Sequence, residues 1–109
     1  MNTEKFNELA QSITKSCLAL MIGKSDEYAR DGDKLANFKK AGDMKGETPE
    51  KALWGMVAKH IIATQDFIND LDDGVVRPLT FWQEKTRDTI NYHILLEALI
   101  TERINNESL

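Results

Sequence analysis

Carboxylates and an amide interrupt the apolar stripe of the last predicted helix, where apolar residues would be expected. At about 100° per residue, Glu84, Asp88 and Asn91 lie on one line of this helix. The same line continues with Leu95 and Leu99, which must pack inward. Burying a carboxylate is costly unless it is paired or binds a cation, so these polar residues are candidates for a binding site. The opposite side, predicted to face solvent, carries Lys85, Thr89, His93 and Glu97.

A second group of polar residues stands at the end of the first predicted helix. Its apolar line, from Phe6 to Leu20, continues as Lys24, Glu27 and Tyr28. If the first and last helices run antiparallel, the end of one lies beside the start of the other. The two polar groups would then converge at one end of the molecule and form a pocket.

The third predicted helix adds further candidates on one face, Lys59, Asp66 and Asp70, with His60 at the edge of its core stripe. Several of the candidate residues also have a simpler interpretation. Asp66 and Asp70 could be solvated, and His60 could be a partly buried packing residue. Glu84 could complement the positive end of a helix dipole.

Helical spacing and turn residues predict the elements that position these side chains. No segment alternates polar and apolar residues for long enough to indicate a strand. The sequence therefore predicts one all-α domain over residues 1–109, an antiparallel helical bundle of three long helices plus one short helix. Its core is small, so we expect it to pair with copies of itself. The predicted helices are about Thr3–Tyr28, a short one after Asp33 that ends near 42–46, one from Thr48-Pro49 to about 72, and one from near Phe81 to Ile104, with a frayed tail from about 105.

Composition narrows the class of protein. The net charge is −4, which disfavours direct binding to duplex DNA. The longest apolar run, 17–22, is too short to cross a membrane, and no signal peptide is visible. A lone cysteine, Cys17, suits a reducing compartment. We expect a cytoplasmic protein, without membrane contact.

Several segments resemble small uncharacterised proteins of phages and prophages in Gram-positive bacteria. By that resemblance the protein would work in the cytoplasm of a host cell. The resemblance extends over most of Phe6 to Arg103. It is carried by residues 24–28, 33–38, Lys59-His60, and Trp82 to Lys85 followed by Asp88, Asn91 and Tyr92.

More distantly, the helical layout and the late acids are similar to MazG-like all-α nucleotide pyrophosphohydrolases. A nucleotide-modification-associated phage family with a comparable Lys-x-x-x-Tyr segment is closer in appearance. In MazG-like enzymes, two pairs of acids hold Mg²⁺ against the phosphates of a nucleotide. The resemblance implies that Glu84 and Asp88 form the second pair, although they are spaced by four residues rather than three. No Glu-x-x-Glu supplies the first pair, for which Asp66 and Asp70, or Glu27, could substitute.

These observations predict a phage-type nucleotide-binding protein, with Mg²⁺-dependent hydrolysis as one form. One alternative is a non-catalytic binder, or sponge, of a nucleotide signal made by host immunity. Another is a small acidic inhibitor that binds a host defence protein. The predicted metal ligands are Glu27, Glu84, Asp88, Asp66 and Asp70, and the predicted nucleotide ligands are Lys24, Tyr28, Asn37, Lys59, His60, Asn91 and Tyr92.

Overall fold

The computed structural model describes the backbone of residues 1–28 and 32–107 and the side chains of residues 1–23 and 32–106. It contains four helices: α1 (Thr3–Tyr28), α2 (Ala36–Lys45), α3 (Pro49–Asp72) and α4 (Leu79–Glu107). The described backbone includes no strand. The predicted all-α fold of three long helices and one short helix is confirmed.

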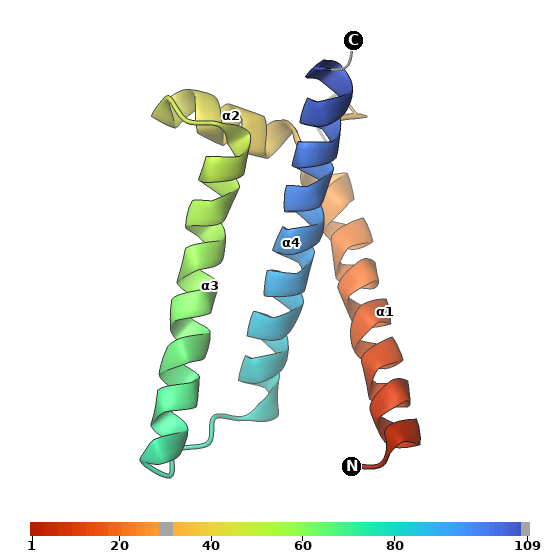
Figure 1. The fold of residues 1–109 in the computed structure, drawn as a ribbon, viewed down its shortest axis with the longest axis vertical. Coiled ribbons are helices and arrows are strands. Elements are labelled where there is room, and N and C mark those ends of the chain that lie inside the picture. The colour runs from red at the N-terminus through yellow and green to blue at the C-terminus, as the bar shows by residue number, and fades with distance from the viewer. Residues whose placement is uncertain (29–31, 108–109) are drawn as a thin grey trace.

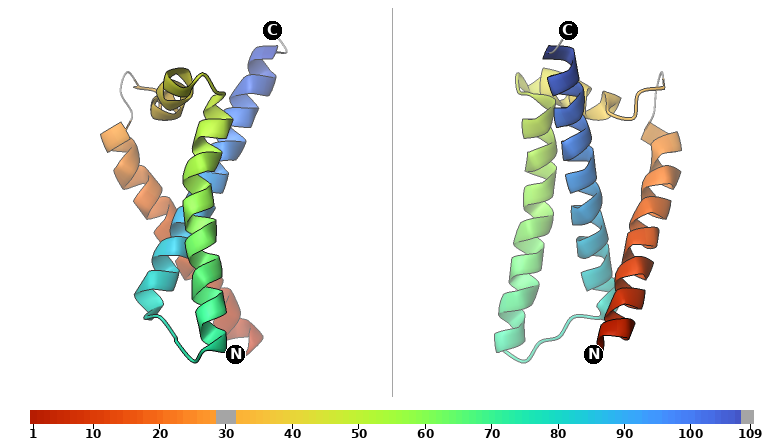
Figure 2. Two further views of the ribbon diagram at one scale, coloured as in Figure 1. Left: turned by 90° about the vertical axis from the view of Figure 1, so that its left-hand side faces the viewer. Right: turned by 45° about the vertical axis from the view of Figure 1, so that its right-hand side comes forward.

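The three long helices stand side by side, with α4 between α3 and α1, and α2 lies across one end (Figure 1). The chain runs down α3 and back up α4, so these two helices are antiparallel as predicted. In contrast, α1 and α4 point in the same direction. They cross near the middle of α1 and diverge towards their ends (Figure 2).

Local sequence explains how α2 is held across the end of the bundle. Asp33 accepts a hydrogen bond from the backbone N–H of Leu35 at 2.9 Å, which turns the chain into the helix. Gly46 ends α2 in a left-handed conformation, with φ of 67°. The next turn passes so close to Gly42 that a Cβ there would lie 2.8 Å from the backbone oxygen of Glu47. Gly42 therefore allows the close return into α3.

The ends of α3 and α4 follow the turn signals in the sequence, with one shift. The Thr48 hydroxyl accepts a hydrogen bond from the N–H of Lys51, and Pro49 occupies the first helical position, as predicted. However, α4 begins at Leu79, before the predicted start near Phe81. The Pro78 carbonyl accepts from the N–H of Phe81 and so forms the first turn earlier. The helix also continues past Ile104, the predicted end, to Glu107.

The hydrophobic core lies where α2, α3 and α4 meet. Leu35, Leu53, Val57 and Leu99 are buried together, and Tyr92 and other half-buried side chains of α4 pack against them. At the other end of the α3–α4 pair, the Phe67 ring contacts Trp82, with ring centroids 5.5 Å apart. Elsewhere many large apolar side chains stay exposed, among them Phe6, Leu18, Trp54, Ile62 and Ile68.

No helix among the described residues is long and apolar enough to cross a membrane.

Candidate functional site

The direction of α1 separates the polar residues at the end of α1 from those at the start of α4, which were expected to converge. The predicted pocket required α1 and α4 to run antiparallel, but they run parallel (Figure 1). The last turn of α1, which carries Lys24, Glu27 and Tyr28, is therefore at the opposite end of the molecule from the first turns of α4, which carry Glu84 and Asp88. The expected convergence is wrong, because the short α2 lies across one end and returns the chain through α3. The side chains of Lys24, Glu27 and Tyr28 lie outside the described part.

Three of the predicted residues meet between α3 and α4, and a fourth, Asn91, is next to one of them in the sequence. Nδ1 of His60 lies 3.8 Å from Oδ2 of Asp88, and both side chains are about one-fifth exposed (18% and 22%). The His60 ring also contacts the Tyr92 ring, with centroids 5.4 Å apart and the ring planes tilted by 48°. Asn91 is the neighbour of Tyr92 on α4 and is half-buried. We call these residues, His60, Asp88, Asn91 and Tyr92, the His60 cluster.

Two atoms of the His60 cluster are buried without a hydrogen-bond partner, Nδ1 of His60 and Oδ1 of Asn91. The 3.8 Å between His60 and Asp88 is too long for a hydrogen bond. Leaving a buried polar atom unpaired costs about 1–3 kcal/mol, so native proteins usually pair such atoms with protein, water or ligand. The unpaired imidazole nitrogen of His60 beside the Tyr92 ring makes this cluster the strongest candidate for a ligand site.

The remaining predicted acids do not join Asp88. Glu84 points outward, with its side chain 65% exposed, rather than into the bundle as its helical line suggested. Asp66 is exposed, and Asp70 is paired with Arg77 at 2.7 Å. Across the side chains of 1–23 and 32–106, no three His, Cys, Asp or Glu residues are grouped to hold a metal ion. The described acids therefore do not form the paired arrangement that the MazG resemblance implies.

Two further predicted nucleotide ligands are exposed and stand apart from each other along the chain. Lys59 is exposed and directly precedes His60 on α3. Asn37 is on α2, at the end of the bundle.

The structure also contains a charged cluster that sequence reasoning missed. Arg103 donates two hydrogen bonds to the Glu50 carboxylate, at 2.9 and 2.8 Å, joining the end of α4 to the start of α3. Lys39 on α2 pairs with Asp33 at 2.8 Å and with Glu102 at 2.6 Å. The partners in the Arg103–Glu50 and Lys39–Glu102 pairs are far apart in the sequence, so no local spacing could reveal them. Each charged side chain of this cluster contacts one of opposite sign, which indicates a clamp between helices rather than a ligand site.

A second missed feature is an apolar groove of about 430 Å³ between α3 and α4. Lys85 and Thr89, predicted to face solvent, are instead half-buried along this groove. The regular spacing of Trp54, Ile61 and Ile68 on α3 was the available signal. The groove is lined by Ile61, Thr64, Gln65, Ile68, Lys85, Thr86, Thr89 and Ile90.

Comparison with protein families, with curated proteins and with solved structures gives no match for this chain. The functional assignment therefore depends on the residues and their geometry.

Proposed function

We propose that the protein binds a nucleotide through the His60 cluster and does not hydrolyse it. The observation that carries the proposal is the buried, unpaired Nδ1 of His60 beside the Tyr92 ring, with a second buried, unpaired atom, Oδ1 of Asn91, on the residue before Tyr92. An imidazole and an amide offer the donors and acceptors that a base edge needs, and an aromatic ring offers a stacking surface. Lys59, exposed next to His60, supplies positive charge for a phosphate.

Binding is favoured over hydrolysis because of where the acids are. Metal-assisted phosphoryl chemistry uses carboxylates that hold the ion against the phosphates. Asp88 is the single predicted acid in the His60 cluster, whereas Glu84, Asp66 and Asp70 point elsewhere or are paired. In a phage setting, a binder without turnover would act as a sponge for a nucleotide signal of host immunity. A Mg²⁺-dependent hydrolase remains the competing form, to be decided by experiment.

Thermal shift tests the proposal, with linear and cyclic nucleotides added in the presence of Mg²⁺ or of EDTA. We expect at least one nucleotide to raise the melting temperature equally in both, because a ligand that binds only the folded state stabilises it. The nucleotide should be recovered unchanged after incubation. A shift that needs Mg²⁺, or a hydrolysed product, would favour the hydrolase. No shift with any nucleotide would reject nucleotide binding.

The substitution Asn91→Leu tests whether the nucleotide binds at the His60 cluster. Leucine has a similar shape and removes a buried polar atom that lacks a partner, so the melting temperature without ligand should stay equal or rise. The nucleotide-induced shift should disappear. The matched control is Asn69→Leu, an exposed position on α3, which should keep the shift. Loss of the shift in the control, or its persistence in Asn91→Leu, would place the ligand elsewhere.

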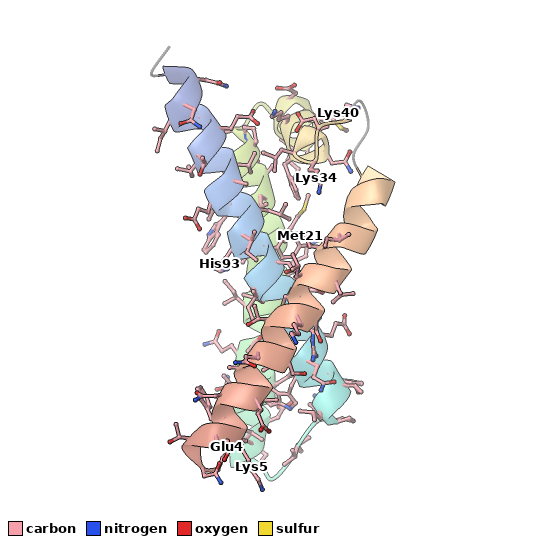
Figure 3. The ribbon with its side chains drawn as sticks, turned by 90° about the vertical axis from the view of Figure 1, so that its right-hand side faces the viewer. Glu4, Lys5, Met21, Lys34, Lys40 and His93 are labelled. Atoms are coloured by element: carbon pink, nitrogen blue, oxygen red, sulfur yellow. The ribbon has the colours of Figure 1, made fainter. Side chains whose placement is uncertain are left out.

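A second candidate function is inhibition of a host protein. The observation that favours it is an exposed apolar face on α1. This helix packs on α4 and buries Cys17 there, but leaves Phe6, Leu9 and Leu20 exposed on the same stripe. Figure 3 shows its first turn, with Glu4 and Lys5, at the end of the molecule away from α2. An exposed apolar helix face is a common binding element for a partner protein. Removing α1 should abolish inhibition without altering the nucleotide-induced shift.

A further inference from the structure

The protein exposes far more surface than a compact chain of its mass. Its accessible surface is 8024 Å², whereas a compact monomer of 12.4 kDa has about 6,100 Å². Its radius of gyration is 16.6 Å, against about 13 Å for a compact domain of this length. The excess surface is about 1,900 Å². In a standard protein–protein interface each partner buries roughly 800 Å², so the excess is enough for a dimer with a larger interface than the standard one.

The apolar groove between α3 and α4 is the part of this surface best shaped for a partner. On α3, Trp54, Ile61 and Ile68 recur every seven residues, which places them on one line of the helix. Their side chains are 47%, 41% and 52% exposed, so the line is accessible along its length. Seven-residue spacing is typical of a seam between packed helices, and here the four described helices leave the line about half exposed.

The α4 side of the groove faces away from α1. Thr86, Thr89, Ile90 and His93 follow each other at helical spacing and share one side of α4. Figure 3 shows His93 on the side of α4 turned away from α1. His93 also contacts Trp54, with ring centroids 6.1 Å apart, which joins the two helices along this face. A partner can therefore approach the groove without displacing α1.

We propose that a second copy of this chain occupies the groove, so that two α3–α4 hairpins pack as a four-helix bundle. Two helices of 24 and 29 residues that expose a shared apolar groove form half of such a bundle. In a two-fold dimer the same side chains meet each other, so a self-pairing surface must carry little charge of one sign. Lys85 is the single charged residue that lines the groove. The dimer is independent of nucleotide binding and extends beyond that proposal.

Light scattering coupled to size exclusion tests the dimer and its location. The wild-type chain of 12.4 kDa should elute with about twice that mass at micromolar concentration. Ile61→Glu should raise the dimer dissociation constant at least ~100-fold, because each dimer then buries two carboxylates. The matched control is Ile62→Glu on the same helix. Ile62 is more exposed, at 58%, and does not line the groove, so this variant should remain dimeric.

Gln65→Glu provides a second disrupting variant that the monomer fold should tolerate. Gln65 is already exposed and lines the groove, so the charge perturbs the dimer and leaves the fold intact. Circular dichroism checks that each variant keeps its helices. A wild-type chain that stays monomeric up to about 100 μM would overturn the proposal and direct attention to a different partner protein. A dimer that resists both Ile61→Glu and Gln65→Glu would place the interface on another face.

Discussion

At the scale of single residues, the charged clamp between α3 and α4 determines how the protein responds to acid. Arg103 donates two hydrogen bonds to Glu50, whose side chain is 15% exposed, and this holds the pKa of Glu50 below its ordinary value of 4.5. A carboxyl whose pKa is lowered by folding stabilises the native state at pH values above its pKa in the unfolded chain. This stabilisation is lost as the pH falls through the pKa of the group in the folded protein. Lys39 lowers the pKa of Asp33 in the same way, mainly through their hydrogen bond.

Glu50→Gln should therefore be less stable than the wild type at pH 7. The difference should shrink as the pH falls below about 4.5, because the unfolded wild-type chain then binds a proton at Glu50 that the native protein takes up only at lower pH. Urea unfolding at a series of pH values measures this difference in the free energy of unfolding. Glu97→Gln is the control, since Glu97 is exposed on α4 and its substitution should change stability little at any pH. A constant difference between Glu50→Gln and wild type from pH 7 to pH 3 would exclude this origin of the acid sensitivity.

At the scale of elements, the close return from α2 into α3 depends on the absence of a side chain at Gly42. A Cβ at this position would meet backbone atoms, the Glu47 oxygen at 2.8 Å and the Pro49 nitrogen at 3.0 Å. Backbone cannot move aside as the end of a flexible side chain can. Gly42→Ala should destabilise the protein by about 1–3 kcal/mol, as overpacking does elsewhere. Chemical unfolding measures the change.

Gly55 on α3 is the matched control for this prediction. A Cβ at Gly55 would have no neighbour within 4 Å, so alanine adds helix propensity without a clash. Gly55→Ala should stabilise the protein by about 0.5–1 kcal/mol. The two substitutions should thus have opposite signs. If both stabilised the protein, the contact of α2 with the turn before α3 would be looser than described.

The sequence predicted the helices well and their mutual placement poorly, for a physical reason. Helix bounds depend on local signals, such as the Thr48 cap and Pro49, and these hold in the structure. The direction of α1 relative to α4 depends on how α2 lies across the bundle, which no local spacing encodes. Consequently the sequence singled out His60 and Asp88 as candidates but did not predict that they meet, and it gave no sign of the pairing of Glu50 with Arg103.

At the scale of the whole molecule, the small core and the large apolar surface make stability depend on association. The buried apolar side chains of the described part are few and include Leu53, Val57 and Leu99. If two copies share the groove, mass action predicts that the melting temperature rises with protein concentration. Between about 1 and 100 μM the rise should be roughly 5–10 °C. Differential scanning fluorimetry measures it, and Ile61→Glu should melt at the same temperature throughout. A constant wild-type melting temperature would contradict the shared groove.

The parallel packing of α1 on α4 also has a consequence for the order of events during synthesis. A ribosome makes α1 well before α4, the helix against which α1 mainly packs. About 50 residues separate them, which at bacterial or eukaryotic elongation rates corresponds to roughly 3–10 s. During that interval the apolar stripe of α1 lacks the helix against which it mainly packs. The nascent protein is thus exposed to chaperones, and to neighbouring nascent copies, until α4 emerges.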